Sequence, residues 1–195
     1  LNALDFPVAA PSANPFGRIS PTKAEHVANY FADELEMVLD GGPCQSGIES
    51  AIIGFDGDNP IIYRLGSISR EDIETVVGPV ESITKNDTTP DAPGMLSRHY
   101  APTTPTVLSN DVLATVMKHQ GKRIGILFFK TIVPHDGIAV AKVLSPNGSE
   151  KEAASKLYAA LHDLDNMNLD VIIAERLPNQ GLGASINDRL LRATK

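Results

Sequence analysis

The sequence contains little cysteine and no long hydrophobic run. Its single cysteine, Cys44, excludes an internal disulfide framework and a cysteine-rich zinc site. A lone cysteine fits a reducing compartment, so a cytoplasmic location is expected. No apolar stretch approaches the ~20 residues that a membrane-spanning helix needs. The five histidines lack His-x-x-x-His or a related spacing, so no metal site is expected.

Basic residues are scarce in the first 83 positions. This segment holds 4 Lys or Arg against 13 Asp or Glu, a net charge of −9, whereas residues 84–195 hold 13 against 11, a net charge of +2. The whole chain carries a net charge of −7. This balance argues against a basic nucleic-acid-binding surface over the whole molecule. In the acidic segment it argues against RNA as a ligand.

The chain begins at Leu1, not at a methionine, and its first residues include neither a basic nor an apolar leader segment. A signal peptide is therefore not expected. A dense motif follows almost at once, which leads us to expect a fragment or a processed chain. The composition is otherwise ordinary, with 42% of the 195 residues hydrophobic and 21% charged. This suits one large domain or two small ones.

Residues 1–83 show turns and short apolar runs that predict a mixed α/β segment. A helix is expected to open at Thr22, which forms a capping-box pattern with Glu25. Ser69 is expected to cap a second, short helix over 71–77. The expected strands are 7–10, a buried run at 50–55, and 61–65, the last two joined by a hairpin turn at 56–60.

Residues 84–106 hold four prolines and no periodic pattern, which predicts a linker. Loops of this length are usually lids or domain connections. Strands and helices then alternate, which predicts a small Rossmann-like α/β domain with a largely parallel sheet. The expected strands are 106–108, 123–129, 138–143 and 171–174, and the expected helices are 112–119, 149–164 and 184–193.

The first candidate site lies in the loop that precedes the first helix. Unpaired N–H groups and the helix dipole favour a phosphate at such an end. Three polar side chains of this loop can add hydrogen bonds, namely Ser12, Asn14 and Ser20. A capped loop without a ligand is the alternative, since Ser and Asn favour turns. The loop is not a P-loop, because no Gly-Lys-Ser/Thr sequence follows.

Further candidates lie at strand ends and in the linker. Ser50 follows a glycine-rich turn and can hydrogen-bond a carboxylate, and Arg64 ends a strand, where it can clamp an anion or stack on a base. Arg98-His99-Tyr100 in the linker suits a lid. An ordinary turn, a solvated arginine and an exposed polar stretch are the respective alternatives. Cys44 has no nearby basic residue in the sequence, so we interpret it as a bystander.

A glycine-rich segment near the end of the chain, 181–184, resembles half of a dinucleotide-binding fingerprint. It lacks the third glycine, and no strand follows it. We therefore interpret it as a helix start. Asp188 and Arg189 are expected to have a structural or interface role.

Taken in order, these motifs resemble one family, the YrdC-like threonylcarbamoyl-AMP synthases, in the branch with an additional C-terminal domain. The resemblance implies that 1–83 form the C-terminal portion of a YrdC-like twisted-sheet α/β catalytic domain. It implies a linker or lid at 84–106 and a small α/β accessory domain at 107–195. The matching segments are 10–14, 17–18, 20–22, 40–42, 47–50, 64–66, 93–95, 98–102, 181–183 and 187–190.

The resemblance also implies an activity. Enzymes of this family combine L-threonine, bicarbonate and ATP, usually with Mg²⁺, and release pyrophosphate and threonylcarbamoyl-adenylate. A partner transferase then moves the threonylcarbamoyl group to a tRNA adenosine, and binding of double-stranded RNA is implied as well. Attack on the α-phosphate is mainly a matter of positioning and charge neutralisation, so no catalytic nucleophile is assigned.

Site residues follow from the same resemblance. Ser12, Ser20 and Arg64 are expected to contact ATP, and Asn14 is expected to support the loop. Tyr100, together with Arg98 and His99, is expected to close the linker over the nucleotide. The backbone around Ala10 and the hydroxyl of Ser50 are expected to hold threonine.

The sequence departs from the family pattern in two respects. Ala51 stands where the family often has threonine. The family's first half, with its Lys-x-Arg motif and other phosphate-gripping basic residues, has no counterpart in this chain, which places catalysis by these residues alone in question. A non-catalytic module that binds nucleotide or RNA is the main alternative. A carbamoyl-transfer domain of a larger enzyme is a third, which the linker and second domain oppose.

Overall fold

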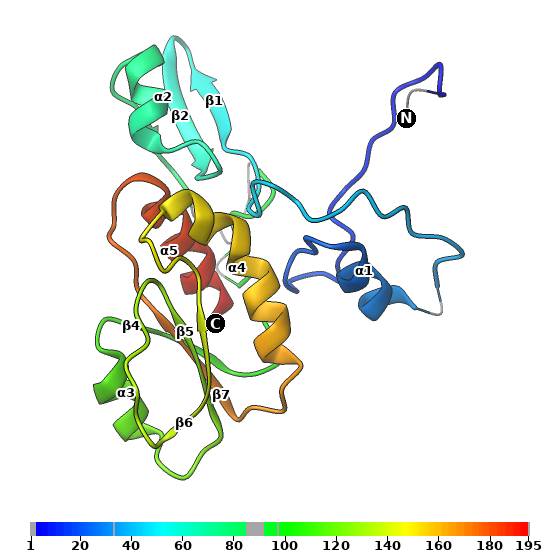
Figure 1. The fold of residues 1–195 in the computed structure, drawn as a ribbon. Coiled ribbons are helices and arrows are strands. Elements are labelled where there is room, and N and C mark those ends of the chain that lie inside the picture. The colour runs from blue at the N-terminus through cyan, green and yellow to red at the C-terminus, as the bar shows by residue number, and fades with distance from the viewer. Residues whose placement is uncertain (1–2, 33, 85–91, 97, 195) are drawn as a thin grey trace.

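The computed structural model describes residues 3–32, 34–84, 92–96 and 98–194. Two sheets divide them into an N-terminal part, residues 3–83, and a C-terminal part, residues 106–194 (Figure 1). The predicted linker lies between them, and its positions 85–91 and 97 are outside the described residues. None of the helices formed by the described residues is long and apolar enough to cross a membrane.

The N-terminal part is built around a β-hairpin. Its strands β1 and β2 are antiparallel and joined by a tight turn, with Asp56 paired to Asn59 across it, as the sequence predicts. A short strand, β3, pairs in parallel with β2. Ser69 accepts a hydrogen bond from the Asp72 N–H and caps α2, also as predicted. The elements are α1 (Ala24–Phe31), β1 (Ile52–Asp56), β2 (Asn59–Arg64), α2 (Arg70–Val77) and β3 (Glu81–Ser82).

Two expectations about strands in this part are wrong. Residues 7–10 form no strand, because no other described segment pairs with them, and they lie extended and exposed. The strand expected at 50–55 exists as β1, but its residues are half-buried or exposed. The reason is that β1 is an edge strand of a three-stranded sheet. Its apolar composition reflects strand propensity rather than burial within the described residues.

The predicted capping box does not form. The N-cap of α1 is Lys23, whose side chain makes no capping hydrogen bond. The Thr22 N–H instead donates to Nδ1 of His26 at 3.1 Å, so a ring nitrogen of the helix itself satisfies this amide. The helix therefore begins two residues after Thr22, at Ala24.

The C-terminal part follows the predicted alternation closely. Its four strands form a fully parallel sheet in the order β4-β7-β5-β6. The glycine-rich segment near the end of the chain is the start of α5, as interpreted from the sequence. The elements are β4 (Thr106–Ser109), α3 (Val112–Lys118), β5 (Ile124–Phe128), β6 (Ile138–Val143), α4 (Glu150–Asp165), β7 (Val171–Glu175) and α5 (Gly181–Ala193).

Alternate residues of the central strands separate two apolar layers. On β7, Val171 and Ile173 pack with Val116 of α3, whereas Ile172 and Ala174 pack with α4 and α5. One face of the sheet is therefore covered by α3 and the other by α4 and α5 (Figure 1). The strands read as continuous hydrophobic runs because both faces are buried.

The core on the α4–α5 side continues into the N-terminal part and the linker. Ile19, Ile48 and Tyr100 belong to the same buried cluster as α4 and α5. Gly47 makes the close approach possible: its φ is +72°, and a Cβ there would lie 2.4 Å from the backbone of Ala154 on α4. The N-terminal part is thus packed directly against these helices.

Candidate functional site

One carboxylate gathers hydrogen bonds from both parts of the molecule. Glu49, just before β1, accepts from Ser20 Oγ at 2.8 Å. The hydroxyl of Tyr158, on α4, donates to its two oxygens at 3.0 and 3.2 Å. Arg189, on α5, donates to Oε2 from Nε and Nη2, both at 3.3 Å. We call these four residues the Glu49 cluster.

The charges of the Glu49 cluster are matched in a buried setting. Burial by itself would raise the pKa of the Glu49 carboxyl, but Arg189 and the hydrogen bonds to Ser20 and Tyr158 outweigh it and lower the pKa. Burial, helped by the Glu49 charge, raises the pKa of Tyr158 well above its ordinary value. Burial would lower the pKa of Arg189, but its tyrosine and carboxylate neighbours raise it. The ion pair is therefore charged at neutral pH.

A cavity of about 440 Å³ opens beside this cluster. Ser12 and Ser20, both predicted to contact ATP, line it together with Glu49 and Tyr158. Ser20 is buried and Ser12 is exposed. The loop of residues 44–48 forms another wall, so Cys44 is part of the lining. The structure thus brings together two of the predicted serines in a concave site that the C-terminal part helps to close.

A second group of predicted residues meets at the end of β2. Arg64 donates from Nε to the Ser50 carbonyl oxygen at 3.1 Å and from Nη2 to Ser50 Oγ at 3.4 Å. Its Nη1 donates to the carbonyl oxygen of Pro93 in the linker at 3.3 Å. The side chain of Arg64 therefore joins the predicted threonine-binding serine to the linker.

Tyr100 reaches this region from the linker. Its backbone is in the left-handed region, with φ of 59°, and its side chain is buried. The ring stacks on Tyr158, with centroids 5.6 Å apart, and the Arg189 guanidinium lies 5.5 Å from its centroid. A Cβ at Gly94 would lie 2.6 Å from the Tyr100 hydroxyl, so glycine permits the linker to pass there.

The other two linker candidates lie differently. His99 packs edge-on against Tyr100, with centroids 4.2 Å apart, and burial lowers its pKa. Its Nδ1 is buried without a hydrogen-bond partner among the described residues. Arg98 is exposed and lines a smaller cavity with Phe16 and Ala101. Contacts of Arg98, His99 and Tyr100 with a nucleotide therefore stay predictions.

The remaining candidates are in the loop before α1. The Asn14 side-chain amide donates to the carbonyl oxygens of Pro15 and Arg18 at 3.1 and 3.2 Å, and its role at an ATP site stays a prediction. Ala10 lies in the extended, exposed segment before Ser12. A role of its backbone in binding threonine stays a prediction.

Sequence reasoning missed the centre of the site. Glu49 stands inside a recognised motif, but its sequence context gave it no role. Arg189 was expected to be structural or interfacial, and its ion pair with Glu49 confirms this. Tyr158 carried no signal at all, because it lies within an amphipathic helix and resembles an ordinary core residue. Only the packing of α4 against the N-terminal part reveals it.

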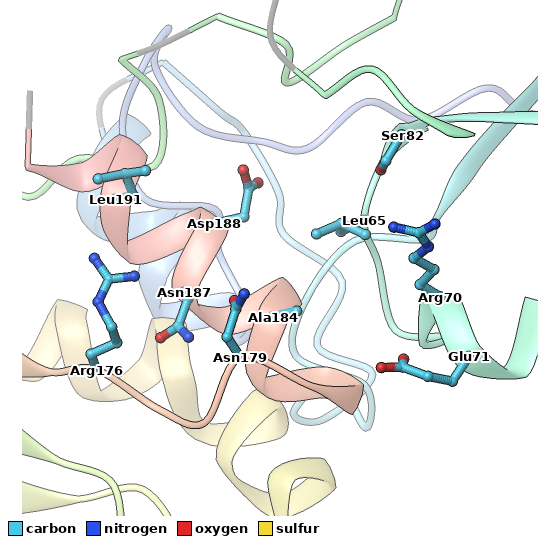
Figure 2. Close-up of a pocket in the computed structure, with 10 residues that line it drawn as sticks. All are labelled: Leu65, Arg70, Glu71, Ser82, Arg176, Asn179, Ala184, Asn187, Asp188 and Leu191. Atoms are coloured by element: carbon cyan, nitrogen blue, oxygen red, sulfur yellow. The ribbon is translucent and has the colours of Figure 1, made fainter. Parts of the chain in front are cut away.

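Another cavity, of about 380 Å³, lies between α5 and the N-terminal part. Figure 2 shows Ala184, Asp188 and Leu191 of α5 on one side and Leu65, Arg70 and Ser82 on the other. None of the predicted site residues lines it. Asp188 is occupied by Arg192, which donates to both of its oxygens at 2.9 and 3.0 Å.

No metal-binding cluster is present in the part of the chain that the structure describes. No group of three or more His, Cys, Asp or Glu side chains converges there. The carboxylate at the 440 Å³ cavity, Glu49, already accepts hydrogen bonds from three side chains. A Mg²⁺ ion at this site would therefore take most of its ligands from substrate phosphates and water.

Fold and site together define a two-part α/β protein in which helix α4, through Tyr158, helps to line a cavity in the N-terminal part. Comparison with known proteins places it further. A family model described as "Threonylcarbamoyl-AMP synthase, C-terminal domain" matches residues 68–194, and one described as "Telomere recombination" (Sua5_yciO_yrdC) matches residues 1–66. The chain belongs to the threonylcarbamoyl-AMP synthase family.

Individual relatives agree with this assignment. The threonylcarbamoyl-AMP synthase of Bacillus subtilis is 36% identical over 96% of this chain and 57% of its own length. That of Pyrococcus abyssi is 33% identical over 96% of this chain and 58% of its own length. The crystal structure of P. abyssi Sua5 complexed with L-threonine matches with a TM-score of 0.80 and 32% identity, covering 94% of this chain and 56% of that one. The chain thus spans little more than half the length of these relatives.

Proposed function

We propose that this chain is part of an L-threonylcarbamoyladenylate synthase. The reaction joins L-threonine, bicarbonate and ATP into threonylcarbamoyl-adenylate and releases pyrophosphate and water. The observation that carries the proposal is the match over 94% of the chain to a protein crystallised with L-threonine. The grouping of Ser12 with Ser20, and of Ser50 with Arg64, supports it.

The proposed reaction needs no side chain that acts as a covalent nucleophile. A carbamate oxygen attacks the α-phosphorus of ATP, and pyrophosphate leaves with the electron pair of the broken P–O bond. Such a step depends on alignment and on neutralising charge at the phosphates. Arg64 is one of only four lysines and arginines in residues 1–83, and it lies half-buried beside Ser50. We assign it to the nucleotide.

The other substrate contacts are assigned as follows. Ser12 and Ser20 face ATP from their shared cavity, and Asn14 holds their loop. The Ser50 hydroxyl and the backbone near Ala10 hold threonine. The linker closes the site through its Arg98-His99-Tyr100 segment.

The proposal extends to organisation and partners. Residues 1–83 form the C-terminal portion of the catalytic domain, 84–106 the linker and 107–195 the accessory domain; the two separate sheets support this division. Mg²⁺ accompanies ATP, held largely through its phosphates. The product passes to a transferase that modifies tRNA, and the protein works in the cytoplasm, as its single cysteine suggests.

The test uses a chimera, because the chain spans only part of its relatives. This chain replaces the matching part of the Bacillus subtilis relative, and pyrophosphate release from ATP is measured. We expect release only when both threonine and bicarbonate are present. Release that does not depend on threonine would contradict the proposal. ATP binding without turnover would favour the alternative, a nucleotide-binding module.

A further inference from the structure

The hydroxyl of Ser20 has a single proton, which it donates in a hydrogen bond to Glu49. A hydroxyl donates one hydrogen bond and accepts others. The 2.8 Å contact with Glu49 must use that proton, because an ionised carboxylate only accepts. Phosphate oxygens at neutral pH are also mainly acceptors. Ser20 can therefore donate to a phosphate in the neighbouring cavity only after it turns away from Glu49.

If the Ser20 hydroxyl turns away, the Glu49 carboxylate loses one hydrogen bond, which is unfavourable for a largely buried charge unless other donors remain. The Glu49 side chain is only 18% exposed, and a buried charge without partners is strongly unfavourable. Here the single hydroxyl proton of Tyr158 is shared between the two carboxylate oxygens, and Arg189 donates from two nitrogens to Oε2. Glu49 keeps these partners whether Ser20 stays or leaves.

We infer that Tyr158 and Arg189 are positioning residues that hold the Glu49 carboxylate while Ser20 turns its hydroxyl to a phosphate of ATP. This inference rests on the proposed function, since it takes ATP as the ligand. It gives the C-terminal part a role in nucleotide binding, because α4 and α5 supply both side chains.

The two positioning residues are themselves rigidly held. The Arg189 side chain is fully buried, and its Nη1 donates to Asp188 at 3.3 Å. Tyr158 is 1% exposed and stacks on Tyr100. The burial and contacts of both side chains restrain them. Ser20 lines the cavity and holds its hydroxyl on one short rotatable bond, so it is the partner of Glu49 that can turn.

Charge points to the same arrangement. The Glu49 carboxylate lines the cavity and would repel the phosphates of a nucleotide there. Arg189 neutralises it from the side away from the cavity, because Arg189 itself does not line that space. The Glu49–Arg189 ion pair therefore keeps Ser20 beside the cavity without adding an uncompensated negative charge there.

The test is Tyr158→Phe in the chimera described above, with the ATP dissociation constant measured by calorimetry. The variant keeps the ring and its stacking and removes only the hydroxyl. Glu49 then relies more on Ser20, so releasing Ser20 to ATP becomes harder. A hydrogen bond to a charged group is typically worth about a factor of ten or more in an equilibrium, and we expect ATP to bind about tenfold more weakly. In turnover the same factor is expected in the KM for ATP, with kcat unchanged.

A double-mutant cycle separates this role from a merely structural one. In a Ser20→Ala background, Tyr158→Phe should have no further effect on ATP binding, because the hydroxyl it helps to release is gone. Tyr30→Phe is the matched control: it removes a tyrosine hydroxyl that donates to the Ile19 carbonyl oxygen, and ATP affinity should stay the same. Arg189→Lys should act in the same direction as Tyr158→Phe, since lysine cannot make the paired contact.

The outcomes distinguish this inference from the proposed function. An unchanged ATP affinity in Tyr158→Phe, or an equal loss with and without Ser20, overturns the inference even if the chimera is active. Threonine-independent turnover overturns the proposed function, whereas the affinity cycle still decides the role of Tyr158. As a readout independent of turnover, carbon NMR of the 195-residue chain should show a higher Glu49 pKa in Tyr158→Phe, because one of its stabilising hydrogen bonds is lost.

Discussion

At the scale of single residues, two arginines one turn apart on α5 tie the molecule together. Arg189 reaches Glu49, and Arg192 donates to the carbonyl oxygens of Leu96 and Thr84 at 2.6 and 2.7 Å. Both guanidinium groups are buried, and both contact Asp188. A buried arginine is tolerated only when its donors are matched in this way. Arg192 therefore attaches two positions of the linker, Thr84 and Leu96, to α5.

Replacing Arg192 by methionine should destabilise the fold strongly. The change keeps an apolar stem but leaves two carbonyl oxygens without this donor and Asp188 with Arg189 alone, and breaking a buried ion pair typically costs about 3–5 kcal/mol. Urea unfolding of the 195-residue chain measures the effect. The control is Lys142→Met, which removes the half-exposed Lys142–Asp163 pair and should cost less than about 1 kcal/mol. Equal losses in the two variants would show that the Arg192 contacts contribute little.

At the scale of elements, the sequence predicts the C-terminal part well and the N-terminal part less well. Strands such as β5 and β7 are continuous apolar runs, and α4 has a clear helical period, so local pattern and final environment agree. In the N-terminal part, tertiary contacts rather than the local sequence pattern determine the secondary structure. The run at 7–10 has the composition of a strand but no described partner, and the expected cap of α1 is displaced by the ring of His26.

The docking of α1 on α4 was not predictable, because it depends on residues far apart in the sequence. His26 and His162 stack with ring centroids 3.9 Å apart, and His162 Nε2 donates to the Ser20 carbonyl oxygen at 3.2 Å. Burial, and then Lys23, lower the pKa of His26, despite Glu25 and Asp163. Burial, and then His26, lower the pKa of His162 to about 4, despite Asp165.

This contact should make stability depend on pH. The folded state holds both histidines neutral, whereas the unfolded chain takes up a proton on each near pH 6.5. Stability should therefore fall as the pH drops from about 6.5 to about 4, and this contribution should be constant below that range. Thermal melting across this range measures it. His162→Gln should flatten the profile, and an equally steep profile in that variant would assign the dependence to other groups.

At the scale of the whole molecule, the two parts behave as one packed body. The buried cluster that includes residues of α4 and α5 also includes Ile19, Ile48 and Tyr100. The N-terminal and C-terminal parts therefore share one hydrophobic core. The sequence indicated Ser12 and Ser20, which line the 440 Å³ cavity, because they lie in short recognisable motifs. It could not indicate the Glu49 cluster, whose members lie up to 169 positions apart, as Ser20 and Arg189 do.

Unfolding should accordingly occur in one step. Calorimetry and circular dichroism of the 195-residue chain are expected to give coincident transitions, because the buried Glu49–Arg189 pair is lost when either part opens. Glu49→Leu should lower the melting temperature markedly, because it removes the acceptor of Nε and Nη2 of the buried Arg189 and leaves only Asp188. Glu74→Gln, which alters an exposed pair with Arg70, is the control and should change it little. Two resolved transitions in the parent chain would contradict this view.

The position of Glu49 also bears on how such a protein can be inherited. If the N-terminal and C-terminal parts were encoded by separate genes, each product would expose a half-built cluster: an acid without its base on one, and a guanidinium and a phenol without their acceptor on the other. A change at position 49 should therefore alter what is tolerated at positions 158 and 189, so an exchange of either part for that of another protein has to keep these three residues matched.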